Sequence, residues 1–98
     1  MDAMHSAELA TKWEGGSIFF IPANSQVKDH EMPLDKLMHK IVMIRDYLRV
    51  LEQQINSHEN LTEGDKIKFQ SYITKCYGSL TSFNFLFYSE EDKFTSKK

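Results

Sequence analysis

The chain is 98 residues long, with a formal net charge of −2, 41% hydrophobic residues and 27% charged residues, values typical of one small folded domain. The acidic balance, without a basic stripe, argues against nucleic-acid binding, because neutralising phosphates supplies most of a nucleic-acid binder's affinity. A single cysteine, an N-terminus without the features of a signal peptide, and apolar stretches too short to cross a bilayer predict a cytoplasmic protein with no membrane partner.

Residues 1–32 are predicted to form an N-terminal arm. A weak helical pattern over 1–14 ends at Gly15-Gly16. Residues 17–21 are β-branched or aromatic after the initial serine and precede Pro22, which predicts a short strand, and the polar residues 22–32 predict a loop. Because a lone strand is not stable, it must pair with a second copy, pair with another protein, or lie extended over a hydrophobic groove.

The clearest signal in the sequence is an amphipathic helix over residues 33–57. Pro33 suits its first turn, and Asp35 places negative charge near its positive end. Branched aliphatic residues then recur at alternating spacings of three and four, which is typical of one apolar helix face. The face consists of Leu34, Leu37, Ile41, Ile44, Leu48, Leu51 and Ile55.

A second helix is predicted over residues 63–88. Thr62 followed by Asp65 resembles a capping box, with Asp in place of the usual Glu. Its apolar face consists of Phe69, Ile73, Cys76, Leu80, Phe83 and Phe87. Two helices joined by a short polar loop should fold back as an antiparallel hairpin over 33–89, followed by a polar tail, 90–98, that we expect to fray.

The hairpin carries more apolar surface than one seam between two helices buries. Bands outside the two predicted faces consist of Met43, Tyr47, Val50, Tyr72, Tyr77, Phe85 and Leu86. A monomeric hairpin would leave much of this surface in water. Two hairpins paired as a four-helix bundle would bury it, which predicts a homodimer with the thirteen face residues as its core. Alternatively, the N-terminal segment folds over a single hairpin.

The sequence predicts no catalytic, cofactor or metal site. The histidines at 5, 30, 39 and 58 lack ligand partners at helical spacing, and the Asp35–His39 spacing is typical of a solvated surface pair. Cys76 lies on the predicted apolar face, where a cysteine usually packs as a small hydrophobic residue. We therefore expect a protein that is not an enzyme.

The strongest polar cluster is Arg45, Asp46 and Arg49, beside Tyr47. The two arginines are four residues apart on one helix face, where they suit a phosphate or a carboxylate. Since Asp46 and Glu52 are within reach, we prefer to interpret the cluster as a salt-bridged solvent face. Arg45, Arg49 and Tyr47 nevertheless remain the candidate contacts for an anion or a partner.

Two functional hypotheses follow from these residues. The leading one is a non-enzymatic, homodimeric helical module that binds or bridges another protein as an adaptor. The alternative is a regulatory protein that binds a small anionic ligand with Arg45, Arg49 and the aromatic residues of the second helix.

Overall fold

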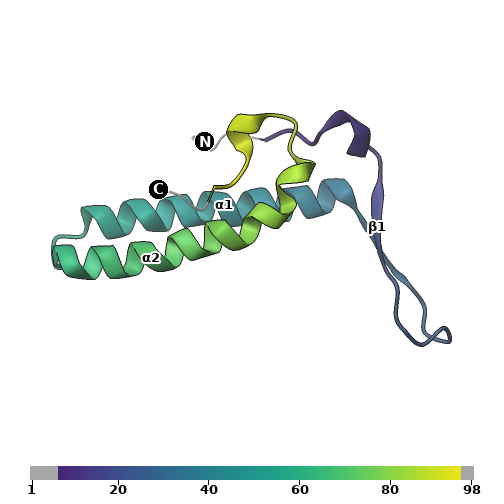
Figure 1. The fold of residues 1–98 in the computed structure, drawn as a ribbon, viewed down its shortest axis with the longest axis horizontal. Helices are drawn as coiled ribbons and strands as arrows, with labels where there is room; N and C mark the ends of the chain where they lie inside the picture. Colours follow the sequence, from purple (N-terminus) through teal and green to yellow (C-terminus); the bar gives the residue numbers. More distant parts are fainter. Residues whose placement is uncertain (1–6, 96–98) are drawn as a thin grey trace.

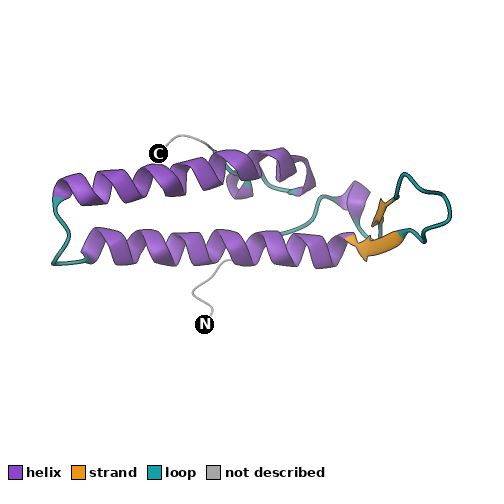
Figure 2. Ribbon diagram, turned by 90° about the horizontal axis from the view of Figure 1, so that it is seen from below, coloured by secondary structure: helices purple, strands orange, loops and turns teal. Residues whose placement is uncertain are grey.

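A computed structural model describes residues 7–95 and shows a helical hairpin from which a two-stranded arm projects (Figure 1). Helices α1 (Leu34–Ser57) and α2 (Glu63–Leu80) lie side by side along most of their length (Figure 2). The arm contains strands β1 (Ser17–Phe20) and β2 (His30–Pro33), and short 3-10 segments span Thr11–Trp13, Thr81–Leu86 and Glu90–Asp92. The predicted mainly helical hairpin is confirmed, and the pairing of two hairpins stays a prediction.

The turn between the helices is fixed by the capping box that the sequence predicts. The Asp65 amide donates to the Thr62 hydroxyl at 3.0 Å, and the Thr62 amide donates to the Asp65 carboxylate at 3.2 Å. Across the turn, Lys66 Nζ donates to the Asn56 carbonyl at 3.0 Å, and Gln70 Nε2 donates to the Asn56 side chain at 3.1 Å. Asn56 therefore ties the end of α1 to the first turns of α2.

The second helix is shorter than predicted, because it ends at Leu80 rather than near residue 88. The chain tightens into the 3-10 segment Thr81–Leu86, which Figure 1 shows turning away from the axis of α2. Phe87 then forms a bridge with Leu9 instead of continuing the helix. The apolar residues over 81–88 thus belong to a segment that folds back over the hairpin. The pairing of Phe87 with the distant Leu9 prevents this segment from continuing the helix, although its spacing is helical.

The predicted strand near 17–21 is present, but its partner lies in the segment that we expected to be a loop. β1 pairs antiparallel with β2, with Ile18 opposite Met32 and Phe20 opposite His30. Gly15 has a positive φ of 77° at the turn into β1, a conformation that favours glycine. The interpretation of 22–32 as a loop is therefore wrong from residue 30, where a four-residue strand with glutamate and proline among its members has little β propensity of its own.

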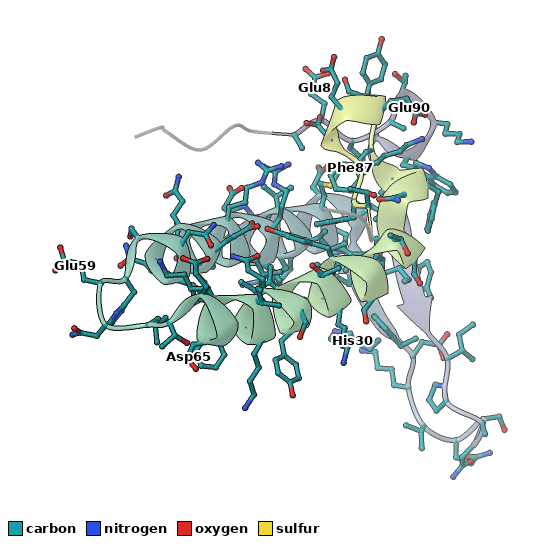
Figure 3. The ribbon with its side chains drawn as sticks, turned by 60° about the vertical axis from the view of Figure 1, so that its left-hand side comes forward. Glu8, His30, Glu59, Asp65, Phe87 and Glu90 are labelled. Atoms are coloured by element: carbon teal, nitrogen blue, oxygen red, sulfur yellow. The ribbon has the colours of Figure 1, made fainter. Side chains whose placement is uncertain are left out.

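The N-terminal segment, residues 7–16, and the C-terminal segment, residues 81–95, lie together on one face of the hairpin. The Ala10 amide donates to the Leu86 carbonyl at 2.7 Å, and the Tyr88 amide donates to the Glu8 carbonyl at 2.9 Å. Figure 3 shows Phe87 pointing toward the helices, whereas Glu8 and Glu90 point away from them. The weak helical pattern over 1–14 yields one 3-10 turn in the described part, and residues 1–6 lie outside it.

The core lies between the terminal segments and the face of the hairpin that they cover. We call this face of the hairpin the covered face. The buried apolar residues of the core are Leu9, Leu34, Met38, Ile41, Ile73, Tyr77, Leu86, Phe87 and Phe94. The expectation that residues 90–98 form a frayed tail is wrong for 90–95, because Asp92 and Phe94 are buried. Residues 96–98 lie outside the described part.

The predicted apolar faces divide into three groups. Leu34, Ile41, Ile73 and Phe87 are buried in the core, and Leu37, Leu48, Ile55, Leu80 and Phe83 are half-buried against it. Ile44, Leu51, Phe69 and Cys76 are exposed. The core of the single chain thus buries the residues along one edge of each predicted apolar face and leaves those along the other edge exposed to water.

Candidate functional site

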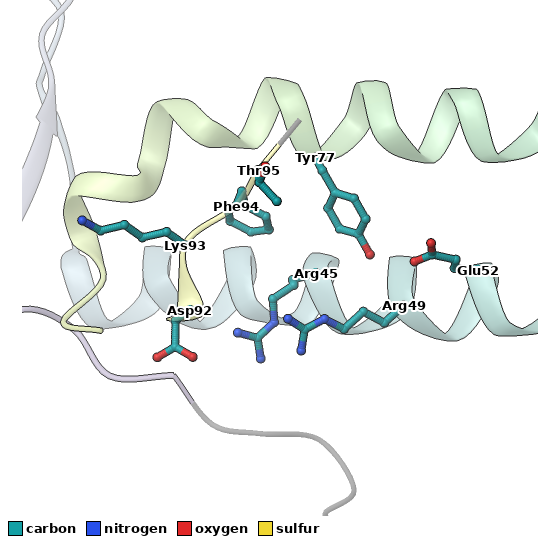
Figure 4. A pocket seen from close by; sticks show the side chains of 8 residues that line it. All are labelled: Arg45, Arg49, Glu52, Tyr77, Asp92, Lys93, Phe94 and Thr95. Atoms are coloured by element: carbon teal, nitrogen blue, oxygen red, sulfur yellow. The ribbon is translucent and has the colours of Figure 1, made fainter. Parts of the chain in front are cut away.

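A cavity of about 250 Å³ lies on the covered face, between the helices and the C-terminal segment (Figure 4). α1 supplies Arg45, Arg49 and Glu52, and α2 supplies Tyr77. The C-terminal segment contributes the remaining lining residues, which are Asp92, Lys93, Phe94 and Thr95. The cavity thus brings together the two arginines that the sequence singled out, but not Tyr47.

Arg45 is a buried charge rather than a member of a solvent face. Its side chain is 2% exposed, and its Nε and Nη2 atoms lie 3.0 and 2.9 Å from Asp46 Oδ1. Asp46 is itself buried, so the pair lies away from water. The interpretation of the cluster as a salt-bridged solvent face is therefore wrong for Arg45. The C-terminal segment covers it, and helix periodicity carries no information about that segment.

The C-terminal segment is held over this pair by Asn84 and Phe94. The Asn84 amide nitrogen donates to the Phe94 carbonyl at 2.9 Å, and the Phe94 amide donates to Asn84 Oδ1 at 2.7 Å. The Phe94 ring lies 6.2 Å from that of Tyr77 and 5.6 Å from that of Phe87, centroid to centroid. One polar clamp and two ring contacts thus fix the segment. The signal in the sequence was Phe94 itself, an aromatic residue in a polar tail.

We expect Tyr77 to ionise at higher pH than an exposed tyrosine. Burial raises its pKa, and the positive charges of Arg49 and Arg45 offset only part of that effect. Because folding favours the neutral phenol, this contribution to stability is complete below a pH of about 10 and is lost as the pH rises through the raised value. Tyr77→Phe should therefore flatten the alkaline fall in the free energy of unfolding, measured by urea denaturation.

Tyr88→Phe is the control for the loss of a phenol hydroxyl, because Tyr88 is 61% exposed, and it should leave the free energy of unfolding at neutral pH within about 0.5 kcal/mol of the wild-type value. Identical profiles for wild type and Tyr77→Phe above pH 10 would contradict the assignment.

The charges around the cavity favour a structural role over anion binding. Arg45 is engaged by Asp46, so Arg49 is the exposed guanidinium of the pair. Lys93 is paired with Glu90 at 2.7 Å, and the carboxylates of Glu52 and Asp92 line the same cavity. An anion entering the cavity would meet these carboxylates as well as the cations. The arrangement suits a segment locked over a buried ion pair.

A second candidate site is an apolar surface on the helical hairpin, which we call the uncovered face. It consists of Ile44, Tyr47, Leu51, Phe69, Tyr72 and Cys76, all of them exposed. Helical spacing places the first three along one stripe of α1 and the other three along one stripe of α2. Tyr47, the third predicted contact residue, therefore belongs to this surface and not to the cavity.

The two stripes lie on the same side of the hairpin, opposite the covered face. Arg45 of α1 and Tyr77 of α2 both line the cavity under the C-terminal segment, which places them on the covered face. Ile44 lies a quarter turn from Arg45 on α1, and Cys76 likewise precedes Tyr77 on α2. Equal offsets on two antiparallel helices rotate in opposite senses. Here both rotate past the buried Ile41 and Ile73 at the seam between the helices, so the two stripes emerge on the same side of the hairpin, away from the covered face. Figure 2, which views the hairpin from the uncovered side, shows both helices with no described segment across them.

Among residues 7–95, no group of three or more His, Cys, Asp or Glu side chains is arranged to hold a metal ion. Within the same residues, no helix is both long and apolar enough to span a membrane. His5 lies outside the described part.

These features define a helical hairpin protein with one covered face, one uncovered face and a projecting β-arm. The chain belongs to the family described as Domain of unknown function (DUF8685), whose model matches residues 3–93. Neither the curated proteins nor the solved structures contain a match. The family description assigns no activity.

Proposed function

We propose that this chain is a non-enzymatic protein-interaction module that pairs with a second copy through the uncovered face. The observation that carries the proposal is the asymmetry of the hairpin. Its covered face is buried beneath both terminal segments, whereas the opposite face, also apolar, has no described segment over it. On soluble proteins, the largest contiguous apolar patch is often a site of interaction.

The size of the uncovered face suits a stable pair. Its five largest side chains are 38–62% exposed and together present on the order of 450 Å² of surface, taking roughly 150–250 Å² for each aromatic side chain when fully exposed and about 150 Å² for each aliphatic one. A standard interface buries about 800 Å² per partner, of which roughly 60% is apolar. The apolar area that one copy offers therefore matches what one side of such an interface requires.

The spacing of the exposed residues also suits helix packing. Ile44 and Leu51 are one heptad apart on α1, and Phe69 and Cys76 are one heptad apart on α2. This repeat supports knobs-into-holes contacts with helices that run nearly parallel or antiparallel to them. Two hairpins stacked through this face would form a four-helix bundle, in which the exposed residues of the predicted apolar faces become buried.

The proposal predicts a dimer that a single charge on the uncovered face disrupts. Light scattering after size exclusion, over a hundredfold concentration range, should give twice the 11.5 kDa mass of the chain. Ile44→Glu should weaken the dimer by at least about 100-fold, because it removes an apolar contact and forces a carboxylate out of water at the centre of the interface. Since Ile44 is 49% exposed in the single chain, the variant should keep its helical circular dichroism.

Gln53→Glu is the matched control, because it introduces the same residue at an exposed position of α1 away from the uncovered face. It should dimerise like the wild-type protein. A wild-type monomer throughout the concentration range would overturn the proposed homodimer. A wild-type dimer that Ile44→Glu does not weaken would show that another surface forms the interface.

A further inference from the structure

The β-arm, residues 17–33, leaves apolar side chains exposed in a small structure that has little stability of its own. Phe19, Phe20, Ile21 and Val27 are 49–74% exposed. The arm is held at its base, where the Leu34 amide donates to the Gly16 carbonyl at 3.0 Å and Ile18 packs against the core. A two-stranded hairpin is marginal without further packing. Its apolar residues therefore need a surface to pack against.

The direction of the arm indicates where such a surface lies. Figure 1 shows the arm leaving the N-terminal end of α1 on the side opposite the C-terminal segment, and Figure 3 agrees from another direction. This is the side of the uncovered face. The arm and the hairpin thus form an L, with the apolar stripes of both helices on its inner side.

We propose that the β-arm of each copy clasps the helical hairpin of the other copy. This inference rests on the proposed homodimer and assigns the arm a role in it. In a two-fold dimer each arm meets the partner's hairpin and receives the partner's arm in return, so both contacts form at once. The occupant of the inner side of the L is therefore a second copy of this chain.

The dimensions of the arm fit this arrangement. Residues 17–21 span about 16 Å at the usual rise of an extended strand. A helix with its side chains is about 10–12 Å in diameter. When a second hairpin is stacked on the uncovered face, an arm of this length reaches past one of its helices. Ile21 and Val27 then lie along the side of that helix.

The charges of the two surfaces are complementary. Lys40 lies on the same stripe of α1 as Ile44 and Leu51, and Lys68 and Lys75 border the stripe of α2. The arm carries exposed Asp29 and Glu31 against one exposed cation, Lys28, and Glu31 also accepts a hydrogen bond from the Ser17 hydroxyl at 2.7 Å. Asp65 is the one carboxylate on the stripe of α2, so each uncovered face carries more lysines than carboxylates, and a clasping arm brings an excess of carboxylates to it.

The energetic test removes the apolar tip of the arm. Ile21→Ser/Val27→Ser should weaken the dimer by at least about tenfold, measured by sedimentation equilibrium. Both side chains are more than half exposed in the single chain, so the helical circular dichroism should not change. Ala23→Ser, at another exposed position of the arm, is the control and should leave the dissociation constant unchanged.

The geometric test uses a spin label on the arm. The label is placed in a Cys76→Ser background that still dimerises by light scattering. The protein with a nitroxide attached at Val27→Cys is mixed with ¹⁵N-enriched protein that carries no nitroxide. The nitroxide should broaden amide resonances of α1 and α2 in the ¹⁵N-enriched copy. A nitroxide at Glu91→Cys, on the covered side, should not broaden them. A monomeric wild-type protein would overturn the homodimer and the clasp together. A dimer with unchanged affinity in the tip variant, or without intermolecular broadening from position 27, would overturn the clasp alone.

Discussion

Arg45→Met is expected to lower the free energy of unfolding by about 3–5 kcal/mol, the usual loss when one partner of a buried ion pair is removed. The substitution keeps most of the volume of the side chain but leaves the buried carboxylate of Asp46 without its guanidinium. Urea denaturation followed by circular dichroism measures the change. Protein concentration must be held constant, because dimerisation contributes to the apparent stability.

Arg49→Met is the matched control, because Arg49 lines the same cavity one helical turn away but is exposed. Its loss should stay within about 1 kcal/mol. Arg45→Met/Asp46→Leu should recover part of the stability, since it removes both charges of the pair. Equal effects of Arg45→Met and Arg49→Met would contradict the assignment of Arg45 as a buried structural charge.

The helices were predictable because their signals are local. The repeat from Leu34 to Ile55 defines α1, and the reciprocal bonds of Thr62 and Asp65 start α2 at the expected residue. Both signals depend on residues within a few positions of one another. Neither needs information about distant parts of the chain.

The predictions that failed depend on contacts between distant residues. α2 ends at Leu80 because Phe87 pairs with Leu9, and the segment 30–33 becomes a strand because β1 lies beside it. Propensity carries no record of either pairing, so the local pattern gave the wrong structure at both places.

The candidate site divides in the same way. The stripes of the uncovered face follow from helical spacing, and Tyr47 lies on them as one of the predicted contact residues. The burial of Arg45 does not follow from spacing, because the residues that cover it are about fifty positions later in the chain. A charged residue on an amphipathic helix is normally exposed, and here the C-terminal segment reverses that expectation.

Phe94→Ala is expected to lower the free energy of unfolding by about 3 kcal/mol, at the lower end of the range for removing a buried phenylalanine. The ring is 7% exposed and lies between those of Tyr77 and Phe87, so its removal leaves a cavity in the core. The clamp from Asn84 bonds the backbone of residue 94 and remains available, which limits the loss to side-chain packing. Urea denaturation at constant protein concentration measures the effect.

The same substitution decides between a packed C-terminal segment and the frayed tail expected from sequence. A frayed tail predicts a change within about 0.5 kcal/mol, as for other surface substitutions. Tyr88→Ala is the control, because that aromatic ring is 61% exposed in the same segment and its removal should have a small effect. If Phe94→Ala destabilises the protein no more than Tyr88→Ala, residue 94 does not belong to the core. A loss of about 3 kcal/mol from Phe94→Ala alone would show that the segment is part of the folded unit and that the covered face is closed in solution.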